Sequence, residues 1–320
     1  MAALAARALC LADAGPSHGE VLQDIPRVSR HREEVQRGAR FAFGENWRLL
    51  VDGIDDARIH AAEASLRAGL GVDSLMGKRF LDAGCGSGLF SLAARRLGAE
   101  VVSFDFDPAS VSCARVLLER FRPGDGGWRI AEGSVLDEQF LATLGEFDVV
   151  YSWGVLHHTG AMWSAIDRVA VRVAPGGTFW IALYNDQGLP SRFWLAVKKT
   201  YNAVPAFLRP PIVWIAFARM WGPTLLRDVL RRQPMRSWRE YGRTGRGMSP
   251  WRDVVDWVGG LPFEVASPEA VVCSVGDLGF DLLTLDTRGR GYGCNEFIFA
   301  RRGEGVAGRG GVVGEPARRG

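Results

Sequence analysis

The sequence predicts an α/β protein with a doubly wound parallel sheet, and two observations carry this prediction. Short apolar runs that suit buried strands alternate with segments whose apolar residues recur at helical spacing. In addition, Gly84, Gly86 and Gly88 directly follow the first apolar run and precede a helical segment. Ligands bind at the carboxyl ends of the strands in sheets of this kind, so these glycines mark the expected site.

The expected elements alternate along the first two thirds of the chain. The helices are expected at residues 56–69, 89–97, 108–120 and 161–173. Asp56 suits the N-cap of the first helix, Pro108 suits the first turn of the third, and the turn APGG follows the fourth. The strands are expected at the runs KRFLDAG, AEVVSFDFD, WRIAEGSV, FDVVYSW and TFWIALYND.

Length and composition narrow the class of protein. A chain of 320 residues can form one elaborated domain or two modest ones, and its net charge of +3 excludes little. The five cysteines are scattered without a C-x-x-C pair, which argues against a disulfide scaffold or zinc finger and favours the reducing cytoplasm. Adjacent histidines rarely bind one metal together, so the pair His157 and His158 does not indicate a metal site.

The two ends of the chain differ in composition from the rest. The alanine-rich start lacks the basic region of a signal peptide, and we expect a flexible segment over residues 1–35. The end is rich in glycine and arginine, and we expect disorder over residues 303–320. No apolar run is long enough to span a bilayer.

The glycine cluster and two acids favour one ligand over another. A dinucleotide fingerprint reads G-x-G-x-x-G, whereas this cluster reads G-x-G-x-G. Asp82 precedes the glycines, where it would repel a phosphate and attract an amino group, and Asp105 ends the next strand, where it can accept hydrogen bonds from ribose hydroxyls. These features suit S-adenosyl-L-methionine (SAM), while the alternative is a turn that only packs helix against strand.

Several stretches together resemble the class I SAM-dependent methyltransferases, and the small-molecule (quinol-type) O-methyltransferases among them. The stretches are FLDAGCGSGLFSLAARRLGAEVVSFDFDP, AEGSVLD, FDVVYSWGVLHHTG and VAPGGTFWIALYNDQG, with SPEAVVCSVGDLGFDLLTLDTRGRGYGCNEFIFARR near the end. The resemblance covers residues 78–188 and resumes at 267–302. It implies a seven-stranded Rossmann-like sheet whose last strand pair contributes one antiparallel strand.

The resemblance also implies which residues hold the cofactor. Asp82, Gly84, Gly86 and Gly88 would line its methionine part, and Asp105 would hold the ribose. The remaining contacts implied are Phe106, Ser134 and Val135 at the adenine, and Ser152 and Trp153 beside the methyl group. Ser134 departs from the family pattern, in which an aspartate is common.

An upstream stretch, RFAFGENWRLL, is similar to the helical cover that many small-molecule methyltransferases place over the cofactor. Trp47 and Arg48 would then close over the methionine end, with Arg48 pairing with its carboxylate. The alternative for Trp47 is a core anchor, because large apolar rings are commonly buried for packing alone.

The histidine pair is the main candidate for catalysis. His157 and His158 follow the fourth strand, at the edge where the methyl group would lie, and neutral imidazole can accept a proton near pH 7. His157 is favoured, because family members often carry an acid or a histidine there. The alternative is that one histidine caps the next helix while the other packs in the core.

A second polar cluster follows the fifth strand. Tyr184 and Asn185 are expected to contact the acceptor, and Asp186 is the other candidate base. The same residues also suit an ordinary turn. Asn295, at the start of the last strand, is a further candidate for substrate binding or for a structural role.

A long stretch between the fifth strand and the closing helix is not explained by the core. We expect residues 189–267 to form a helical lid inserted into a core made of residues 36–188 and 268–302. The lid is basic and rich in tryptophan, which suits an anionic or lipid-like small substrate, contact with an anionic membrane, or RNA. The alternative is a solvated basic face over a small separate core.

The sequence therefore predicts a SAM-dependent methyltransferase that acts on a hydroxyl of a small molecule. Methyl transfer mainly requires alignment of a nucleophile with an activated methyl group. No N-P-P-[YF] motif or cysteine follows the fourth strand, which disfavours a DNA-modifying enzyme, and no RNA-binding module is evident. The alternatives are an RNA or protein methyltransferase and an inactive module that keeps the SAM-binding fold.

Overall fold

The computed structural model of the chain describes residues 30–244, 249–289, 291 and 293–303. Most of the segment expected to be flexible (1–35) and of the tail expected to be disordered (303–320) lies outside the described residues.

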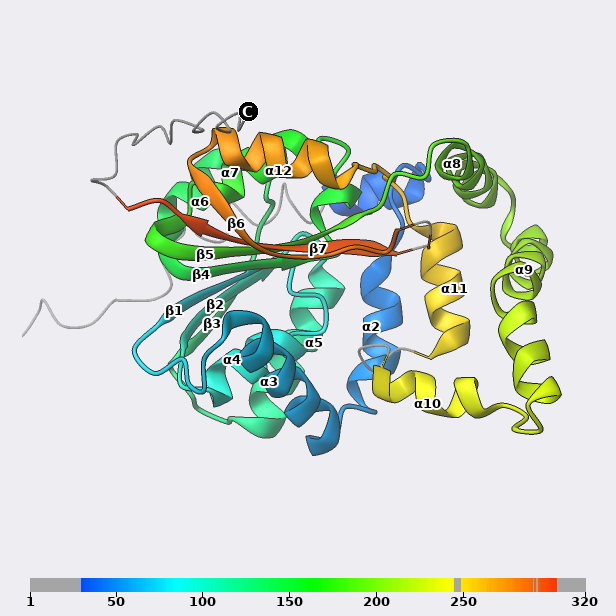
Figure 1. Cartoon of the computed structure of the whole chain (residues 1–320), viewed down its shortest axis with the longest axis horizontal. Coiled ribbons are helices and arrows are strands. Elements are labelled where there is room, and N and C mark those ends of the chain that lie inside the picture. Colours follow the sequence, from blue (N-terminus) through cyan, green and yellow to red (C-terminus); the bar gives the residue numbers. More distant parts are fainter. Residues whose placement is uncertain (1–29, 245–248, 290, 292, 304–320) are drawn as a thin grey trace, which may run out of the picture.

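A sheet of seven strands forms the centre of the molecule (Figure 1). Its strands are β1 (Arg79–Ala83), β2 (Glu100–Asp105), β3 (Trp128–Glu132), β4 (Phe147–Trp153), β5 (Val173–Tyr184), β6 (Phe280–Asp286) and β7 (Cys294–Arg301). Their order is β3-β2-β1-β4-β5-β7-β6, and β7 runs antiparallel to both β5 and β6. The predicted Rossmann-like fold with one antiparallel strand is confirmed.

Helices cover both faces of the sheet, and each face has its own apolar core (Figure 1). One face carries α3 (Asp56–Leu70), α4 (Leu89–Arg96) and α5 (Pro108–Phe121), and the other carries α6 (Glu138–Leu144), α7 (Met162–Ala170) and α12 (Pro268–Asp277). Side chains alternate across each strand, so Phe80 lies in the first core and its neighbour Leu81 lies in the second.

Some local predictions were wrong at the ends of elements. The N-cap of α3 is Asp55, whose side chain accepts a hydrogen bond from the Arg58 amide, and not Asp56. The strand β5 begins at Val173, so the stretch APGG lies within it and not in a turn outside it. The pairing of β5 with β4 shifts register across this stretch, which accommodates the glycines and the proline. Sequence patterns locate the ends of helices and strands poorly, because each end depends on which group forms the last hydrogen bond of the element.

The stretch between β5 and α12, which we call the insertion (residues 189–267), contains four helices in its described part. They are α8 (Leu189–Ala203), α9 (Arg209–Leu230), α10 (Arg236–Thr244) and α11 (Pro250–Gly259), with a short 3-10 turn at Ala206–Leu208. These helices pack around their own apolar cluster, which includes Trp194, Trp221 and Val254. They lie beyond the carboxyl end of the sheet (Figure 1).

The helix α2 (Phe43–Val51) lies between the core and α11 (Figure 1). Its Gly44 amide donates to Asp107 Oδ2 at 2.8 Å, at the start of α5. On the other side, the Asn46 side-chain amide donates to Asp256 of α11. The segment of residues 30–51, which we call the cover, therefore joins the core to the insertion.

Candidate functional site

The glycine loop (residues 84–88) folds over the end of β2. The amides of Gly84 and Cys85 both donate to the Phe104 carbonyl, at 2.8 and 3.0 Å. Gly84, Gly86 and Gly88 all have positive φ, at 84°, 53° and 81°, which side chains rarely adopt. The tight turn therefore requires glycine, and it places buried or half-buried backbone at the carboxyl edge of the sheet.

Close packing also limits the glycine positions. A Cβ atom on Gly84 would lie 2.3 Å from the Val155 side chain, and one on Gly88 would lie 2.8 Å from Ala114. A Cβ atom on Gly86 would lie 3.1 Å from the Trp47 indole. The glycine loop thus contacts the segment after β4, α5 and the cover at once.

Both predicted acids lie at the loop. Asp82 is buried in β1 and accepts a hydrogen bond from Ser91 Oγ at 2.6 Å. Asp105 accepts from the amides of Gly86 and Asp107, both at 2.9 Å. Burial raises the pKa of Asp105 to about 6, against the effect of these two amides. The loop and the second acid are therefore held in one fixed arrangement.

The cover closes the open side of this loop. Trp47 is partly buried against Gly86, whereas Arg48 is exposed. The Arg40 guanidinium lies 4.9 Å from the centre of the Phe106 ring, and its Nη1 donates to the His158 carbonyl at 3.0 Å. Arg40 thus links the residue after Asp105 with the histidine pair.

Sequence reasoning did not single out Arg40 or a second residue of the cover, His31. The His31 ring packs edge-on against Phe106 at 5.5 Å, and its Nε2 lies 3.5 Å from Asp107 Oδ2. Arg40 opens the quoted stretch RFAFGENWRLL, which was the available signal, whereas His31 lies upstream of any motif.

The remaining predicted cofactor residues follow strands β3 and β4. Ser134 Oγ accepts from the Leu136 amide at 3.1 Å, and Val135 is buried in the apolar core. Ser152 Oγ donates to the Ala83 carbonyl at 2.7 Å, and Trp153, partly buried, ends β4. These residues lie at the same sheet edge as the glycine loop, because parallel strands end together.

The histidine pair forms a short 3-10 turn, Leu156–His158, directly after β4. His157 is fully buried, and among the described residues neither of its ring nitrogens has a hydrogen-bond partner. Its ring lies against that of Tyr184, with centroids 3.9 Å apart and the ring planes tilted by 37°. His158 Nδ1 lies 2.6 Å from the Pro262 carbonyl, which can only accept, so Nδ1 carries the proton.

Burial determines the charge of the pair. It lowers the pKa of His157 well below the ordinary value, and it lowers that of His158 to about 3. The positive charge of Lys198 also lowers the pKa of both histidines. Both imidazoles are therefore neutral at pH 7, and the same lowered pKa makes each a weaker proton acceptor than an ordinary histidine.

Lys198 was not singled out from the sequence, where it counted among the basic residues of the lid. Its side chain is fully buried, and its Nζ donates to the Trp257 carbonyl. Burial lowers its pKa to about 7, and Asp256 opposes this shift. The pattern that could have identified Lys198 is its helical spacing from Trp194 and Tyr201, which places all three on the buried face of α8.

The polar residues after β5 lie in two different settings. Asn185 and Asn295 are buried and joined by a 3.0 Å hydrogen bond. The Asn185 side-chain amide also donates to the Gly289 carbonyl, and the Asn295 side-chain oxygen accepts from the Arg288 amide. These side chains therefore hold the loop before β7. Asp186, by contrast, is exposed.

Asp186 accepts from the Gly188 amide at 2.8 Å, as in an ordinary turn. It also lines a cavity of about 200 Å³ together with Ser191, Arg192 and Phe263, among others.

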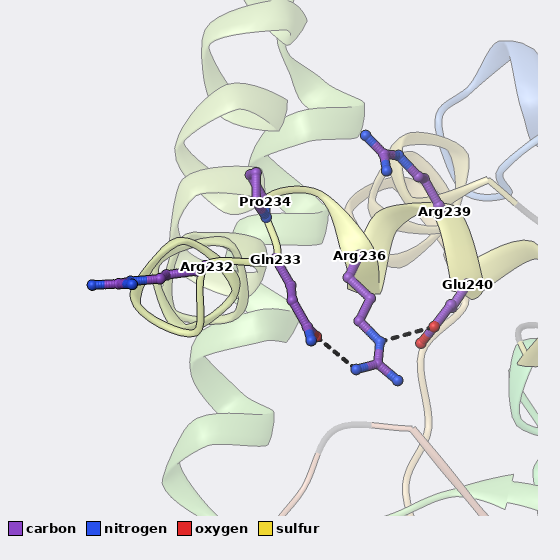
Figure 2. Close-up of a pocket in the computed structure, with 6 residues that line it drawn as sticks. All are labelled: Arg232, Gln233, Pro234, Arg236, Arg239 and Glu240. Carbon is purple, nitrogen blue, oxygen red and sulfur yellow. Dashed lines mark hydrogen bonds and ion pairs between the residues drawn. The ribbon is translucent and has the colours of Figure 1, made fainter.

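A larger cavity, of about 520 Å³, lies at the junction of α9 and α10. Figure 2 shows that Arg232, Arg236 and Arg239, which line it, point in different directions. Arg236 bonds to Glu240 and Gln233. The arginines therefore do not converge on one anion.

Two general properties concern the part of the chain that the structure describes. It contains no group of three or more histidine, cysteine, aspartate or glutamate side chains arranged to hold a metal ion. It also contains no helix long and apolar enough to cross a membrane.

Comparisons with known proteins agree with this geometry. The family described as "Methyltransferase domain" matches residues 57–243, more than half of the chain. A ubiquinone biosynthesis O-methyltransferase of Xanthomonas campestris is 35% identical over 125 residues, which is 39% of this chain and 49% of that protein. The enzyme of the same name from Stutzerimonas stutzeri is 36% identical over 114 residues, which is 35% of this chain and 47% of that protein.

The chain thus spans about half the length of the curated relatives it matches. A solved structure, magnesium protoporphyrin IX methyltransferase from Synechocystis with bound S-adenosylhomocysteine (SAH), is similar with a TM-score of 0.45 and 16% identity. That likeness covers 77% of this chain and 84% of the other. From the family match, together with the glycine loop and its two acids, the chain belongs to the methyltransferase-domain family, whose cofactor is SAM.

Proposed function

We propose that this chain transfers the methyl group of SAM to a hydroxyl oxygen of a small molecule. The observation that carries the proposal is the direct contact between the glycine loop and the segment that bears the histidine pair, through Gly84 and Val155. This contact supports a site for the cofactor beside two neutral imidazoles. The curated relatives, which are O-methyltransferases, support the choice of oxygen.

For the cofactor, we assign the roles by position. Asp82 and the glycine loop would hold the amino acid part with Trp47 and Arg48, and Asp105 would accept from the ribose hydroxyls. Phe106, Ser134 and Val135 would frame the adenine, and Ser152 and Trp153 would lie beside the reacting centre. The cofactor supplies a methyl group that is already activated by the positive sulfur.

For the acceptor, the chain's own residues orient a hydroxyl and remove its proton. His157 is the proposed base, because its ring nitrogens lack partners among the described residues and its imidazole is neutral. Asp186 is the alternative base. Tyr184, Asn185 and Asn295 would position the acceptor, the two asparagines by holding the loop before β7.

The same proposal covers the organisation of the chain. Residues 36–188 and 268–302 would form the catalytic core, and the insertion would form a lid that selects the acceptor. We place the protein in the cytoplasm, which suits the free thiols of Cys85, Cys113, Cys273 and Cys294.

Calorimetry with SAH, followed by incubation with labelled SAM and fractionated cell extract, tests the function. We expect heat on binding and a labelled small product whose mass rises by one methylene. Label in RNA or protein would favour those acceptors instead. SAH binding with no labelled product would favour an inactive module, and no SAH binding would remove the proposal altogether.

A second proposal concerns where the acceptor is met. The helix α9 exposes Trp214, Ile215 and Leu230 by 60%, 73% and 75%, alongside the exposed Arg219 and Arg227. Apolar side chains flanked by arginines suit the surface of an anionic membrane, and a lipid-like acceptor would be reached from it.

Flotation with vesicles of anionic or neutral lipids tests this contact. We expect binding to the anionic vesicles that is weakened by Trp214→Ser. Trp163→Ser, at an exposed tryptophan of α7, is the matched control. Equal binding to both vesicle types would contradict the proposal.

A further inference from the structure

Lys198 is a buried cation whose Nζ has one oxygen partner and several aromatic neighbours. Among the described residues, its Nζ has one hydrogen-bond acceptor, the Trp257 carbonyl, and no carboxylate forms an ion pair with it. An ammonium group has three donors, and a buried polar group without partners is costly. Lysines are seldom kept in such a position for packing alone. Aromatic rings surround the amine, and among the described residues no second oxygen accepts from it, so a ligand oxygen could bind its remaining donors.

The rings around Lys198 form one wall of a common site. Its Nζ lies 4.6 Å from the Phe263 ring centre, 4.9 Å from that of Trp257 and 5.8 Å from that of Tyr184. The ring of His157 also lies against that of Tyr184. A buried amine and a buried imidazole thus both lie next to the Tyr184 ring.

The charged and titratable groups facing Lys198 come from several elements. The charge of Asp256, on α11, raises the pKa of Lys198, and burial raises the pKa of Asp256 itself to about 7. His157 and His158, after β4, are both affected by the Lys198 charge, and Tyr184 lies on β5. Asp256, the group of opposite charge, accepts a hydrogen bond from the Asn46 side chain of the cover and forms no ion pair with Lys198.

We propose that Lys198 is a further acceptor-binding residue, which donates a hydrogen bond to the acceptor oxygen that receives the methyl group. The inference rests on the function proposed above. The acceptor hydroxyl gives its proton to His157, its oxygen forms a bond to the methyl carbon, and the electron pair of the broken carbon–sulfur bond stays on sulfur. Lys198 stabilises the negative charge that develops on the oxygen. The acceptor class is a hydroxyl acidic enough to ionise in the site.

A structural role makes a different prediction. Lys198 also joins α8 to α11 through the Trp257 carbonyl, and this link alone would explain a buried donor there. Lys198→Gln keeps a donor for that carbonyl but carries no charge, whereas Lys198→Met removes both. Lys199→Gln, at the exposed neighbour on α8, is the matched control.

The test uses the full chain saturated with SAH and 4-nitrophenol as the probe, since its anion absorbs visible light and its neutral form does not. We expect the wild type and Lys199→Gln to bind the probe as its anion, with its acid dissociation strengthened about tenfold, or about 1.4 kcal/mol. We expect Lys198→Gln and Lys198→Met to lose this spectral shift while still binding SAH with wild-type heat.

Each other result overturns the inference. If Lys198→Gln keeps the shift, Lys198 has only a structural role. If the wild type does not ionise the probe, no oxygen anion is held there. A lack of SAH heat in the wild type is a separate result, because it removes the proposed function before Lys198 is tested.

Discussion

The cofactor side and the acceptor side of the site are built differently. Apart from Trp47 and Arg48 of the cover, the predicted cofactor residues come from short continuous stretches at the ends of β1, β2, β3 and β4. The candidate acceptor residues come from distant parts of the chain, because His157, Tyr184, Lys198 and Trp257 meet only where the insertion folds back onto the sheet.

Because the two sides are built differently, we expect substitutions to change cofactor binding and turnover separately. The cofactor side is rigid, since the glycine loop is held by backbone hydrogen bonds to β2 and by close packing on three sides. The acceptor side depends on side chains buried between the sheet and helices that have their own apolar cluster. A substitution on the acceptor side should therefore leave SAH affinity largely unchanged, and a substitution on the cofactor side should leave the arrangement of the acceptor residues largely unchanged.

The largest effect is expected from His157→Phe, which keeps a ring against Tyr184 and removes the ring nitrogens. Turnover should fall by about 10²- to 10⁴-fold, the usual contribution of a general base. SAH affinity by calorimetry should stay near that of the wild type. His60→Phe, at an exposed histidine of α3, is the control. Full turnover in His157→Phe would exclude this base and favour Asp186.

Gly84→Ala tests the rigidity of the cofactor side. SAH affinity should fall by about 100-fold or more, because the new Cβ meets Val155 at 2.3 Å as well as a positive φ. Gly124→Ala has a similar φ of 73° but nothing within 4 Å, so it measures the backbone strain alone. Equal losses in the stability and SAH affinity of the two variants would show that close packing is unimportant.

Asp105→Asn should weaken SAH binding by about 10- to 100-fold, because the charged acceptor proposed for the two ribose hydroxyls is replaced by a neutral one. The pKa of Asp105 is raised to about 6, so the wild-type carboxylate becomes protonated as the pH falls through that value. Wild-type affinity for SAH should therefore fall below about pH 6. Calorimetry across this range should show no such fall attributable to residue 105 in Asp105→Asn.

The smallest effect concerns stability on the acceptor side. The Lys198 amine has a pKa of about 7 in the folded chain and 10.5 as its ordinary value, so the unfolded chain binds more protons between these limits. The free energy of unfolding should rise with pH there, by up to about 1.4 kcal/mol per pH unit from this group. Urea denaturation around pH 7.5 and 9 should show this rise in the wild type relative to Lys198→Met. An equal slope in both chains would place the Lys198 pKa near its ordinary value.

Much of the architecture was predictable from the sequence. Strand runs, glycines with an acid before them, and a second acid at the next strand end are all local patterns, and parallel strands bring their ends to one edge by topology alone. Thus the alternation of strands and helices, the placement of Asp82 and Asp105 around the glycine loop, and the position of the histidines after β4 were predicted from the sequence. The helices α6 and α10 were not predicted, because both are short and α10 consists mostly of polar residues.

The sequence alone determined the fold and the edge of the sheet at which ligands would lie, because these depend on hydrogen bonding and apolar periodicity within short stretches. Only the tertiary structure decided that Arg40 and His31 close over Phe106, that Asn185 and Asn295 bond to each other, and that Lys198 is buried. A side chain's burial and partners depend on which distant helix packs against it, and no local pattern records that choice.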